Sequence, residues 1–342
     1  AAPSCDPMGN ISGVNGEASC GSMGYAIADA IYAKKKIAIT DTIVDYPNYP
    51  SDITEDYVDY ILKVDSIGDK NGIVSGTTKV TKDPVGLKIA KDTLKVMKAS
   101  GLLKDGFSYQ SGAGGISLAV TDFLRDYMIK ENIKGSFASG GITGYLTDML
   151  EEGLFTSLYD VQCFDLKAIE SIKKNTNHLR MSGSEYGNPE VSAVVDNLDV
   201  VILGATEIDL DFNVNVITGA DGMLMGGSGG HQDTAAGAKM SIIVSKLFSS
   251  RLPVIKNRVD VIATPGTTID VLVTERGIAV NPLRQDLIEK FKANGLNVMT
   301  IKELKAIADN FMGEPNDIKK KVRIIGYSEY RDGSILDAIY EV

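Results

Sequence analysis

The feature that most constrains the fold of this chain is a repeated succession of an apolar strand, a glycine-rich turn and a helix. After FSYQ, the turn SGAGG (111–115) leads into SLAVTDFLRDYMIKENI, which has the pattern of a helix. GSFASGG then leads into ITGYLTDMLEEGLF, a second expected helix, and DVQCFD (160–165) follows as a strand. Strands that alternate with helices in this way predict an α/β fold.

Further elements continue this pattern upstream. We expect strands at IAIT (37–40) and within YVDYILKVDSI (57–67). After a break at Pro84, VGLKIAKDTLKVMKASGLL (85–103) has apolar residues at helical spacing with lysines between them. This spacing predicts an amphipathic helix that Gly101 ends.

Downstream, several apolar runs follow one another with short connections. They are DVVILGA (199–205), FNVNVI (212–217), SIIVSKL, RVDVIAT (258–264) and DVLVTE, and we expect each of them to be a strand. LRQDLIEKFKANG predicts a helix with a C-terminal glycine. Consecutive strands of this kind indicate a mixed sheet flanked by helices.

The length of 342 residues exceeds that of one ordinary core, so we expect two domains, residues 1–81 and 82–342. The chain starts with Ala1 instead of a methionine, and its first stretch, AAPSCDPMGN, has no positively charged n-region, so we expect no signal peptide. We take the first residues to lie inside a fold, as in a fragment.

Composition excludes several classes of protein. Hydrophobic residues make up 44% and charged residues 23% of the chain, which is typical of a globular protein. The net charge of −10 argues against a nucleic-acid groove and against binding to an anionic membrane. The longest apolar runs fall short of the ~18 residues that a membrane span needs. The cysteines, at positions 5, 20 and 163, form no CxxC pair and suit a reducing cytoplasm.

Two glycine-rich segments are candidates for binding. QSGAGG can expose backbone N–H groups at Gly112, Gly114 and Gly115 to an anion or an oxyanion, although this motif by itself favours a tight turn without ligand. GGSGGHQDTAAGAK (226–239) lacks the Lys-Ser/Thr pair of a phosphate-binding P-loop. It is either a flexible surface loop or a segment that packs closely against the chain or a ligand.

Charged side chains offer a second set of candidates. Glu207 and Asp209 follow a buried strand, where they are either a nucleophile or base, or a solvated strand end. Glu275 and Arg276 lie in a turn between two strands. His178, expected in a polar loop, and His231 are far apart, with no cysteine expected near either, so we expect no metal site and no hydrolase triad.

Together these segments resemble the α subunit of citrate lyase, in the citrate CoA-transferase family. The segments that carry the resemblance run from near residue 2 to the end. They are GNISGVNGEASCGSMGYAIADA, VDYILKVDSIGDKNGIVSGTTKVTKDPVGLKIA, FSYQSGAGGISLAVTDFLR, IKGSFASGGITGYLTDMLEEGLF, LDVVILGATEIDLDFNVNV, GGSGGHQDTAAGAK and DVLVTERGIAVNPLRQDLIE. The resemblance implies two related CoA-transferase-like domains, with residues 1–81 as the C-terminal part of a first domain largely missing from this chain and 82–342 as the whole second.

The resemblance also implies an activity and partners. The acetyl group on an acyl-carrier-protein thioester, or on acetyl-CoA, would be exchanged for citrate, giving a citryl thioester and acetate. A β subunit would cleave the citryl thioester, and a small γ subunit would carry the CoA-like phosphopantetheine-type arm. It implies a cytoplasmic enzyme and a homo-oligomer, and we expect neither nucleic acid, membrane nor metal to take part.

The chemistry of this exchange agrees with the residues present. Citrate is ionised at neutral pH and needs no general base, whereas the tetrahedral oxyanion needs oriented donors. We expect Gly114 and Gly115 to supply them, and Glu207 either to form a covalent intermediate, as in the wider group, or to line the site. The segment 226–231 would line the thioester and its arm through Gly226, Gly227, Ser228, Gly229, Gly230 and His231, together with Gly112. Arg180, Arg276 and Arg284 are the candidate partners for citrate, with a surface ion pair as the alternative for each. We favour the ion pair for Arg180 and Arg284, and Arg276 is the favoured partner for citrate.

Three other functions stay open on the sequence alone. The first is a CoA-transferase or acyl-CoA hydrolase for a simpler carboxylic acid. The second is a non-catalytic assembly subunit. The third is a nucleotide-binding regulator, which neither glycine loop supports in full.

Overall fold

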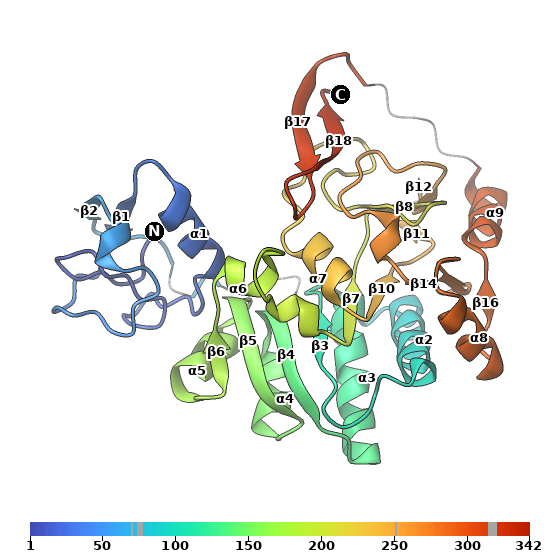
Figure 1. The fold of residues 1–342 in the computed structure, drawn as a ribbon, viewed down its shortest axis with the longest axis horizontal. Coiled ribbons are helices and arrows are strands. Elements are labelled where there is room, and N and C mark those ends of the chain that lie inside the picture. Colours follow the sequence, from blue (N-terminus) through green and yellow to red (C-terminus); the bar gives the residue numbers. More distant parts are fainter. Residues whose placement is uncertain (70, 74–77, 250–251, 314–319) are drawn as a thin grey trace. The chain divides into compact units, whose positions relative to one another are not determined.

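The computed structural model describes residues 1–69, 71–73, 78–249, 252–313 and 320–342 (Figure 1). The chain forms two compact units, one of residues 1–78 and 134–194 and the other of residues 79–133 and 195–342. Each unit contains two separate stretches of the chain, whereas the expected segments 1–81 and 82–342 are each continuous. The division into two CoA-transferase-like domains stays a prediction.

The first unit contains two groups of strands. Strand β1 (Ile37–Thr40) pairs in parallel with β2 (Tyr60–Lys63), and β5 (Phe155–Cys163) pairs in parallel with β4 (Gly135–Ile142) and β6 (His178–Arg180). The helices of this unit are α1 (Gly24–Tyr32), α4 (Gly144–Glu151), α5 (Leu166–Lys174) and α6 (Gly183–Gly187), with the short 3-10 turn η1 (Glu55–Tyr57). The strands and helices expected at 37–40, 57–67 and 142–155 are therefore confirmed.

The second unit is built on a mixed sheet. Its strands β3 (Tyr109–Ser111), β7 (Val200–Leu203), β10 (Met240–Val244) and β14 (Val271–Val273) are parallel neighbours in this order. Strand β15 (Ile278–Val280) runs antiparallel to β14, and β16 (Val298–Met299) runs parallel to β15. The mixed sheet flanked by helices is thus as the sequence predicts, because these runs are rich in β-branched residues and are buried on both faces.

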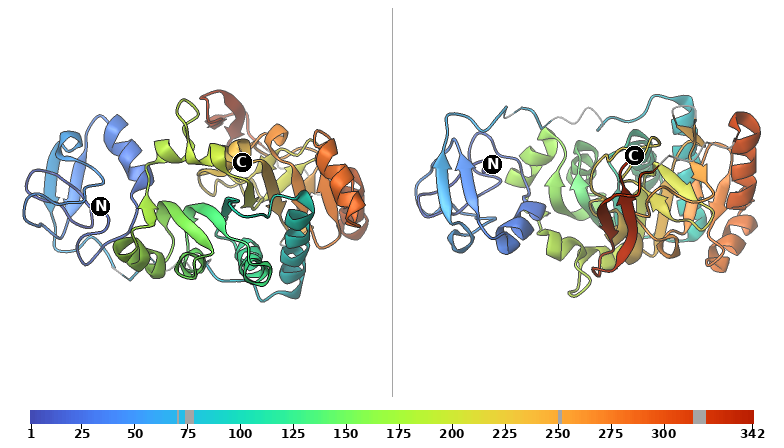
Figure 2. Two further views of the ribbon diagram at one scale, coloured as in Figure 1. Left: turned by 60° about the horizontal axis from the view of Figure 1, so that its bottom comes forward. Right: turned by 90° about the horizontal axis from the view of Figure 1, so that it is seen from above.

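The remaining elements of the second unit surround this sheet. The helices are α2 (Pro84–Ser100), α3 (Gly115–Glu131), α7 (His231–Gly237), α8 (Gln285–Ala293) and α9 (Ile301–Met312), with 3-10 turns η2 (Val194–Asn197) and η3 (Gly266–Thr268). The short strands are β8 (Glu207–Asp209), β9 (Val214–Asn215), β11 (Phe248–Ser249), β12 (Leu252–Pro253) and β13 (Ile255–Lys256), followed by the hairpin β17 (Ile324–Glu329) and β18 (Ile335–Tyr340). Helices α2 and α3 pack against each other beside the sheet (Figure 2).

Local sequence sets the ends of α2. The Asp83 side chain accepts a hydrogen bond from the Gly86 amide at 2.9 Å, and Pro84 occupies the first turn, where its missing N–H costs nothing. Gly101 ends the helix with a φ of 78°, a left-handed conformation that glycine adopts without strain. The expected helix and its glycine end are both confirmed.

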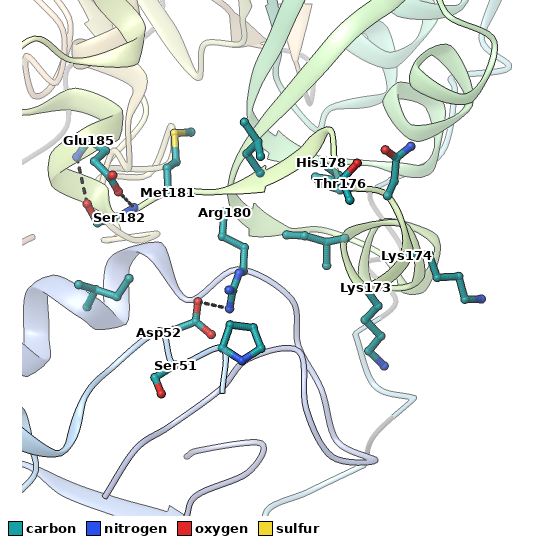
Figure 3. Close-up of a pocket in the computed structure, with 15 residues that line it drawn as sticks. Ser51, Asp52, Lys173, Lys174, Thr176, His178, Arg180, Met181, Ser182 and Glu185 are labelled. Atoms are coloured by element: carbon teal, nitrogen blue, oxygen red, sulfur yellow. Dashed lines mark hydrogen bonds and ion pairs between the residues drawn. The ribbon is translucent and has the colours of Figure 1, made fainter. Parts of the chain in front are cut away.

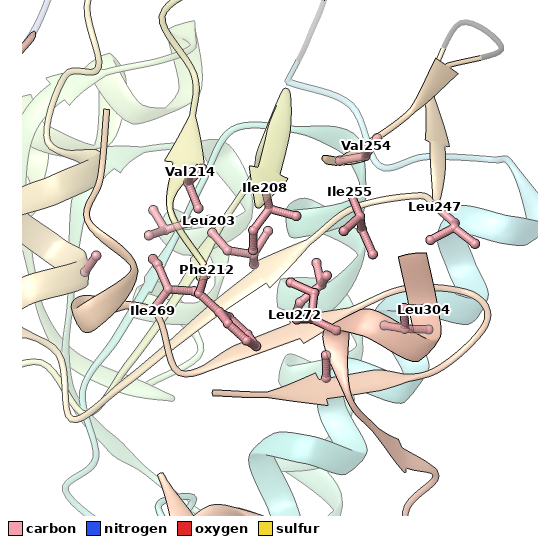
Figure 4. Packing of buried hydrophobic residues seen from close by; sticks show 14 of the residues in the cluster. Leu203, Ile208, Phe212, Val214, Leu247, Val254, Ile255, Ile269, Leu272 and Leu304 are labelled. Atoms are coloured by element: carbon pink, nitrogen blue, oxygen red, sulfur yellow. The ribbon is translucent and has the colours of Figure 1, made fainter. Parts of the chain in front are cut away.

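A cluster of buried apolar side chains lies beside β7 and β8 (Figure 4). Leu203, Ile208, Phe212, Val214 and Leu272 belong to it, and each is at most 6% exposed. Burial of this apolar surface fixes the short connection between β7 and β8, and Glu207 is the first residue of β8.

Two of the expected strands differ in the structure. RVDVIAT (258–264) is irregular, because the amides of Val259 and Asp260 donate to the carboxylates of Asp209 and Glu207 instead of to a neighbouring strand. FNVNVI forms a strand only at Val214–Asn215, since Phe212 has a φ of 66°, outside the strand region. Among the described residues, none of the helices combines the length and apolar character that crossing a membrane requires.

Candidate active site

A cavity of about 370 Å³ opens in the second unit at the carboxyl ends of β3, β7 and β10. The residues that line it are Gly114, Gly115, Ile116, Ser117, Gly204, Ala205, Val244, Ser245, Lys246, Phe248 and Ser249. In open α/β sheets ligands bind at this edge of the strands. The position and the polar lining therefore make this cavity the candidate active site.

The start of helix α3 forms one wall of the cavity. Gly114 is the N-cap and provides no side chain to the first-turn amides, which leaves the N–H groups of a 17-residue helix open toward an anion. A Cβ on Gly114 would meet nothing within 4 Å, whereas one on Gly115 would lie 3.0 Å from the Lys79 carbonyl oxygen. Gly115 thus permits close packing, and Gly114 keeps the cavity open.

Gly112 has a different position from the other two glycines of this loop. Its amide donates to the carbonyl oxygen of Ile202 at 2.9 Å, which ties the loop to β7. It is not among the residues that line the cavity. The structure therefore brings Gly114 and Gly115 into the candidate site, with Gly112 holding the loop behind them.

Lys246 is a cavity residue that the sequence did not single out. Its ammonium nitrogen lies 3.0 Å from the Asp83 carboxylate, and nearly half of its side chain is exposed. The sequence feature that could have predicted its place is that Ser245 and Lys246 directly follow a buried strand, because the carboxyl ends of neighbouring parallel strands lie at one edge of a sheet. A partly exposed ammonium group near the N-terminal amides of a helix can exchange its ion-pair partner and bind a carboxylate.

Glu207 is buried, with its side chain only 3% exposed, and it has three partners. One carboxylate oxygen accepts hydrogen bonds from the Asn215 side-chain amide at 3.1 Å and from the Asp260 amide at 3.0 Å. Lys256 lies 3.6 Å from the other oxygen. Glu207 follows the cavity residues Gly204 and Ala205 in the chain but does not itself line the described cavity.

The second carboxylate of this segment, Asp209, has a structural role. It accepts hydrogen bonds from the amides of Asp211 at 3.0 Å and Asn213 at 2.9 Å, and from the Asn213 side chain. These bonds hold the turn in which Phe212 adopts its positive φ. Of the two acids, only Glu207 stays a candidate for chemistry.

The loop of residues 226–230 lies outside the residues that line this cavity. Its glycines are largely exposed, and Gly229 has a φ of 55°, which favours glycine. The loop leads into α7, and the first residue of that helix, His231, is only 9% exposed. Contact of this loop with a CoA-like arm stays a prediction.

His231 is connected to the cavity wall by one hydrogen bond. Its Nε2 lies 2.9 Å from the carbonyl oxygen of Gly204, and its Nδ1 lies 2.7 Å from the Thr264 hydroxyl. Burial lowers the pKa of His231 to about 4, so the ring is neutral near pH 7. Both ring nitrogens are engaged inside the protein, which does not suit a general base.

None of the three candidate arginines is among the residues that line this cavity. Arg276 is exposed and stacks its guanidinium 5.3 Å from the centre of the Phe311 ring. Arg284 pairs with Asp270 at 2.7 Å and with Asp286 at 3.0 Å. For Arg284 this agrees with the ion-pair interpretation, and for Arg276 a role in binding citrate stays a prediction.

Arg180 lines a second cavity, of about 600 Å³, within the first unit (Figure 3). Its guanidinium lies 2.8 Å from the Asp52 carboxylate, and its side chain is 25% exposed. Lys173 and Lys174 line the same cavity, but both pair with Glu170. Each of these cations therefore has an acidic partner, with Glu170 shared by the two lysines, and the ion-pair interpretation of Arg180 is confirmed.

The prediction that His178 lies in a polar loop, away from any cysteine, is wrong. His178 begins strand β6, and the parallel register with β5 places it beside Asp160 and Cys163 in a fully buried cluster. Asp160 Oδ2 lies 3.0 Å from His178 Nε2 and 2.9 Å from Cys163 Sγ, and Ser171 lies 3.0 Å from His178 Nδ1. The sequence feature that could have predicted this cluster is an acid within one strand, Asp160, and a histidine, His178, at the start of the next parallel strand.

The distances in this cluster are those of hydrogen bonds. Ligand atoms around a tetrahedral Zn²⁺ at ~2.0–2.3 Å from the ion are separated by roughly 3.3–3.5 Å, farther than these pairs. Burial and the neighbouring Asp160 raise the pKa of the Cys163 thiol, so Cys163 stays protonated and donates to the carboxylate. The cluster therefore functions as a buried hydrogen-bond network of the first unit.

The sequence of this chain is similar to known proteins over nearly its whole length. The family model of the citrate lyase alpha subunit (CitF) matches residues 1–342. The citrate lyase alpha chain of Klebsiella pneumoniae is 47% identical over 341 residues, covering 99% of this chain and 67% of that protein. That of Escherichia coli K12 is 46% identical over 341 residues, with 99% and 67% covered.

Solved structures give the same result for the fold. A structure from Streptococcus mutans, described as a citrate lyase alpha subunit in complex with citrate, has a TM-score of 0.96 and 47% identity, covering 100% of this chain and 67% of that one. A Pseudomonas malonate decarboxylase hetero-tetramer in complex with malonate contains a chain with a TM-score of 0.60 at 15% identity, with 84% of this chain and 60% of that one covered. The second likeness concerns the fold alone.

Proposed function

The chain belongs to the family of citrate lyase alpha subunits, and from this premise we propose that it exchanges the acetyl group of an acyl-carrier thioester for citrate. The products are a citryl thioester and acetate. The observation that carries this proposal is the cavity at the ends of β3, β7 and β10, which the N-cap and first residues of α3 line.

In the proposed reaction, a carboxylate oxygen of citrate attacks the carbonyl carbon of the thioester. The α3 amides next to Gly114 and Gly115 donate to the oxyanion that forms, and the thiolate leaves without needing a strong acid. The thiolate then attacks the citryl carbonyl of the mixed anhydride, and acetate leaves. Atoms and charge balance, and no general base is required because citrate is already ionised.

Lys246 supports this proposal as a partner for one of the remaining carboxylates of citrate. Lys246 lines the cavity, and its ammonium group forms an exposed ion pair with Asp83, a kind of contact that contributes little to stability and can be exchanged. Arg276 and the loop of residues 226–231 are proposed as secondary contacts of citrate and of the CoA-like arm. Gly112 supports the loop that carries the donors.

Two roles of Glu207 are compatible with its position. In a covalent route its carboxylate attacks the thioester, and in the direct route it only holds the wall that ends at Gly204 and Ala205. The buried hydrogen bonds from Asn215 and Asp260 support the second role, because a nucleophile would have to leave them.

The experiment that tests the proposal measures citrate-dependent release of labelled acetate from the acetylated carrier protein. We expect citrate to be accepted and acetate or butyrate to be poor acceptors; equal rates with butyrate would favour a transferase for simpler acids. Release of acetate to water at the same rate without any acceptor would favour an acyl-CoA hydrolase. In Glu207→Gln, loss of a hydroxylamine-trappable enzyme adduct would establish the covalent route, and unchanged turnover would exclude any catalytic role.

Partners, location and domains follow from the same premise. We propose that the chain acts with a β subunit and a γ carrier subunit, as a homo-oligomer in the cytoplasm. Residues 1–81 would belong to a first CoA-transferase-like domain. The bare face of the β1–β2 pair, where Ile37 and Tyr60 are 57% and 58% exposed, supports this, because parallel strands are normally covered on both faces.

A further inference from the structure

His231 lies between two groups that come from distant parts of the chain. Its Nε2 is 2.9 Å from the carbonyl oxygen of Gly204, directly after β7, and its Nδ1 is 2.7 Å from the hydroxyl of Thr264. Thr264 is completely buried. The bond to Thr264 therefore forms away from water, where an unmade bond is costly, and the bond to Gly204 is partly buried.

The partners of the ring determine which nitrogen carries the proton. A carbonyl oxygen can only accept, so the bond to Gly204 requires a proton on Nε2. In the neutral ring Nδ1 then has a lone pair, which accepts the hydrogen bond that the Thr264 hydroxyl donates. The carbonyl oxygen of Gly204 thereby selects the tautomer, and the Thr264 hydroxyl, which can donate or accept, holds the other side of the ring by donating to Nδ1.

The bond to Gly204 completes the restraint of the segment 204–207. The Thr206 amide donates to the Asn215 carbonyl oxygen at 2.9 Å, and the Asn215 side chain donates to Glu207 at 3.1 Å. Thr264 is tied to the same segment, because its amide donates to the carbonyl oxygen of Val214, the residue before Asn215, at 3.1 Å. The segment is thus held at its carboxyl end by Asn215 and at its amino end by His231.

We propose that His231 is a positioning residue that fixes the Gly204–Ala205 wall of the cavity, which the first residues of α3 also line, and that Thr264 holds the His231 ring in place through Nδ1. The catalytic consequence rests on the proposed exchange reaction. The arrangement of the ring itself does not, so the two can be tested apart.

The first test concerns the ring alone and needs no activity. The chain has only two histidines, so a sample labelled with ¹⁵N at histidine gives two sets of ring signals, and His231→Gln identifies the set of His231. We expect the Nε2–H tautomer of a neutral ring from pH 8 to pH 5, and a shifted Nδ1 signal in Thr264→Val, which removes the hydrogen-bond donor to that nitrogen. A ring that gains a proton between pH 7 and 6, or that carries its proton on Nδ1, would overturn the proposal.

The second test concerns catalysis in the full protein. We expect Thr264→Val and His231→Ala to lower kcat by about 10- to 100-fold with a small change in the KM for citrate, because the wall shifts relative to the oxyanion donors. Thr264→Ser and His231→Gln, which keep a hydroxyl and a donor, should restore much of the rate. Thr268→Val, which removes a hydroxyl that bonds only Pro265 among the described contacts, is the matched control and should leave kcat unchanged.

The outcomes separate the two proposals. A wild-type kcat in Thr264→Val, or an ionisation near pH 6.5 that is present in the kcat profile of the wild type and absent in His231→Ala, would overturn the positioning role. Absence of citrate exchange in the wild type would overturn the proposed function, while the ring spectra would still decide the tautomer.

Discussion

The ammonium nitrogen of Lys256 lies 3.6 Å from a carboxylate oxygen of Glu207, and the two side chains are only 14% and 3% exposed. Removing one member of a buried pair leaves the other charge without its partner. Because Glu207 keeps the hydrogen bonds from Asn215 and Asp260, we expect Lys256→Met to lower the free energy of unfolding by about 1–3 kcal/mol. Urea unfolding followed by circular dichroism measures this change.

A double-mutant cycle isolates the interaction between these two residues. In the presence of Glu207→Gln, the charge on position 207 is gone, and Lys256→Met should then cost less than it does alone. If the two changes are additive within ~0.5 kcal/mol, the 3.6 Å contact contributes nothing to stability.

Gly114 offers a test of the oxyanion wall. Its φ of −68° and ψ of 149° suit any residue, and a Cβ there would meet nothing within 4 Å, so Gly114→Ala should fold as the wild type does. The added methyl group enters the cavity next to the α3 amides, and we expect kcat/KM for citrate exchange to fall by about 10-fold or more. Gly183→Ala, which adds a methyl group in ordinary contact elsewhere, is the control. A wild-type rate in Gly114→Ala would show that the α3 amides take no part in the reaction.

Lys246 is expected to contribute to citrate binding. Lys246→Met keeps the length of the side chain and removes its charge, and we expect the KM for citrate to rise about 10-fold with a smaller change in kcat. Asp83→Asn frees the ammonium from its partner in the structure and should not raise that KM. An unchanged KM for citrate in Lys246→Met would show that its charge points to solvent during the reaction.

Local patterns in the sequence predict the regular elements of this chain well. Helix α2 has an N-cap at Asp83, a proline in the first turn and a glycine end, so its boundaries follow from neighbouring residues alone. RVDVIAT has the alternation of a strand, but its amides bond to the carboxylates of Glu207 and Asp209, about 50 residues away in sequence. No local pattern contains that competition.

The candidate site shows the same limit. Gly114 and Gly115 lie in a turn between a strand and a helix, and this context predicts their open amides. Lys246 and Thr264 reach the site only through the order of the strands and the contact with His231, which the sequence does not give. The burial of His178 depends in the same way on the register of β6 against β5.

Arg276 can be tested through its contact with Phe311. If Arg276 binds citrate, Arg276→Ala raises the KM for citrate, and Phe311→Leu, which keeps the charge, has a smaller effect. If the guanidinium only stacks on the ring at 5.3 Å, each change lowers the free energy of unfolding by about 0.5–1 kcal/mol and leaves the KM alone. Because Arg276 is proposed as a secondary contact of citrate, we expect the first result, and an unchanged KM for citrate in Arg276→Ala would remove Arg276 from the site.

The burial of His231 predicts how stability depends on pH. Burial lowers its pKa in the folded protein to about 4, against 6.5 for an exposed histidine, so between these values the unfolded chain binds a proton that the folded protein does not. The free energy of unfolding therefore falls as pH decreases, and from pH 7.5 to 5.0 this residue accounts for a loss of about 2 kcal/mol. Asp233, whose pKa burial raises to about 6, has the opposite sign, but it is present in both wild type and His231→Gln. Urea unfolding of these two proteins at both pH values should show a loss that is about 2 kcal/mol smaller in His231→Gln, because glutamine does not titrate; equal losses would mean that the ring accepts a proton in the folded protein.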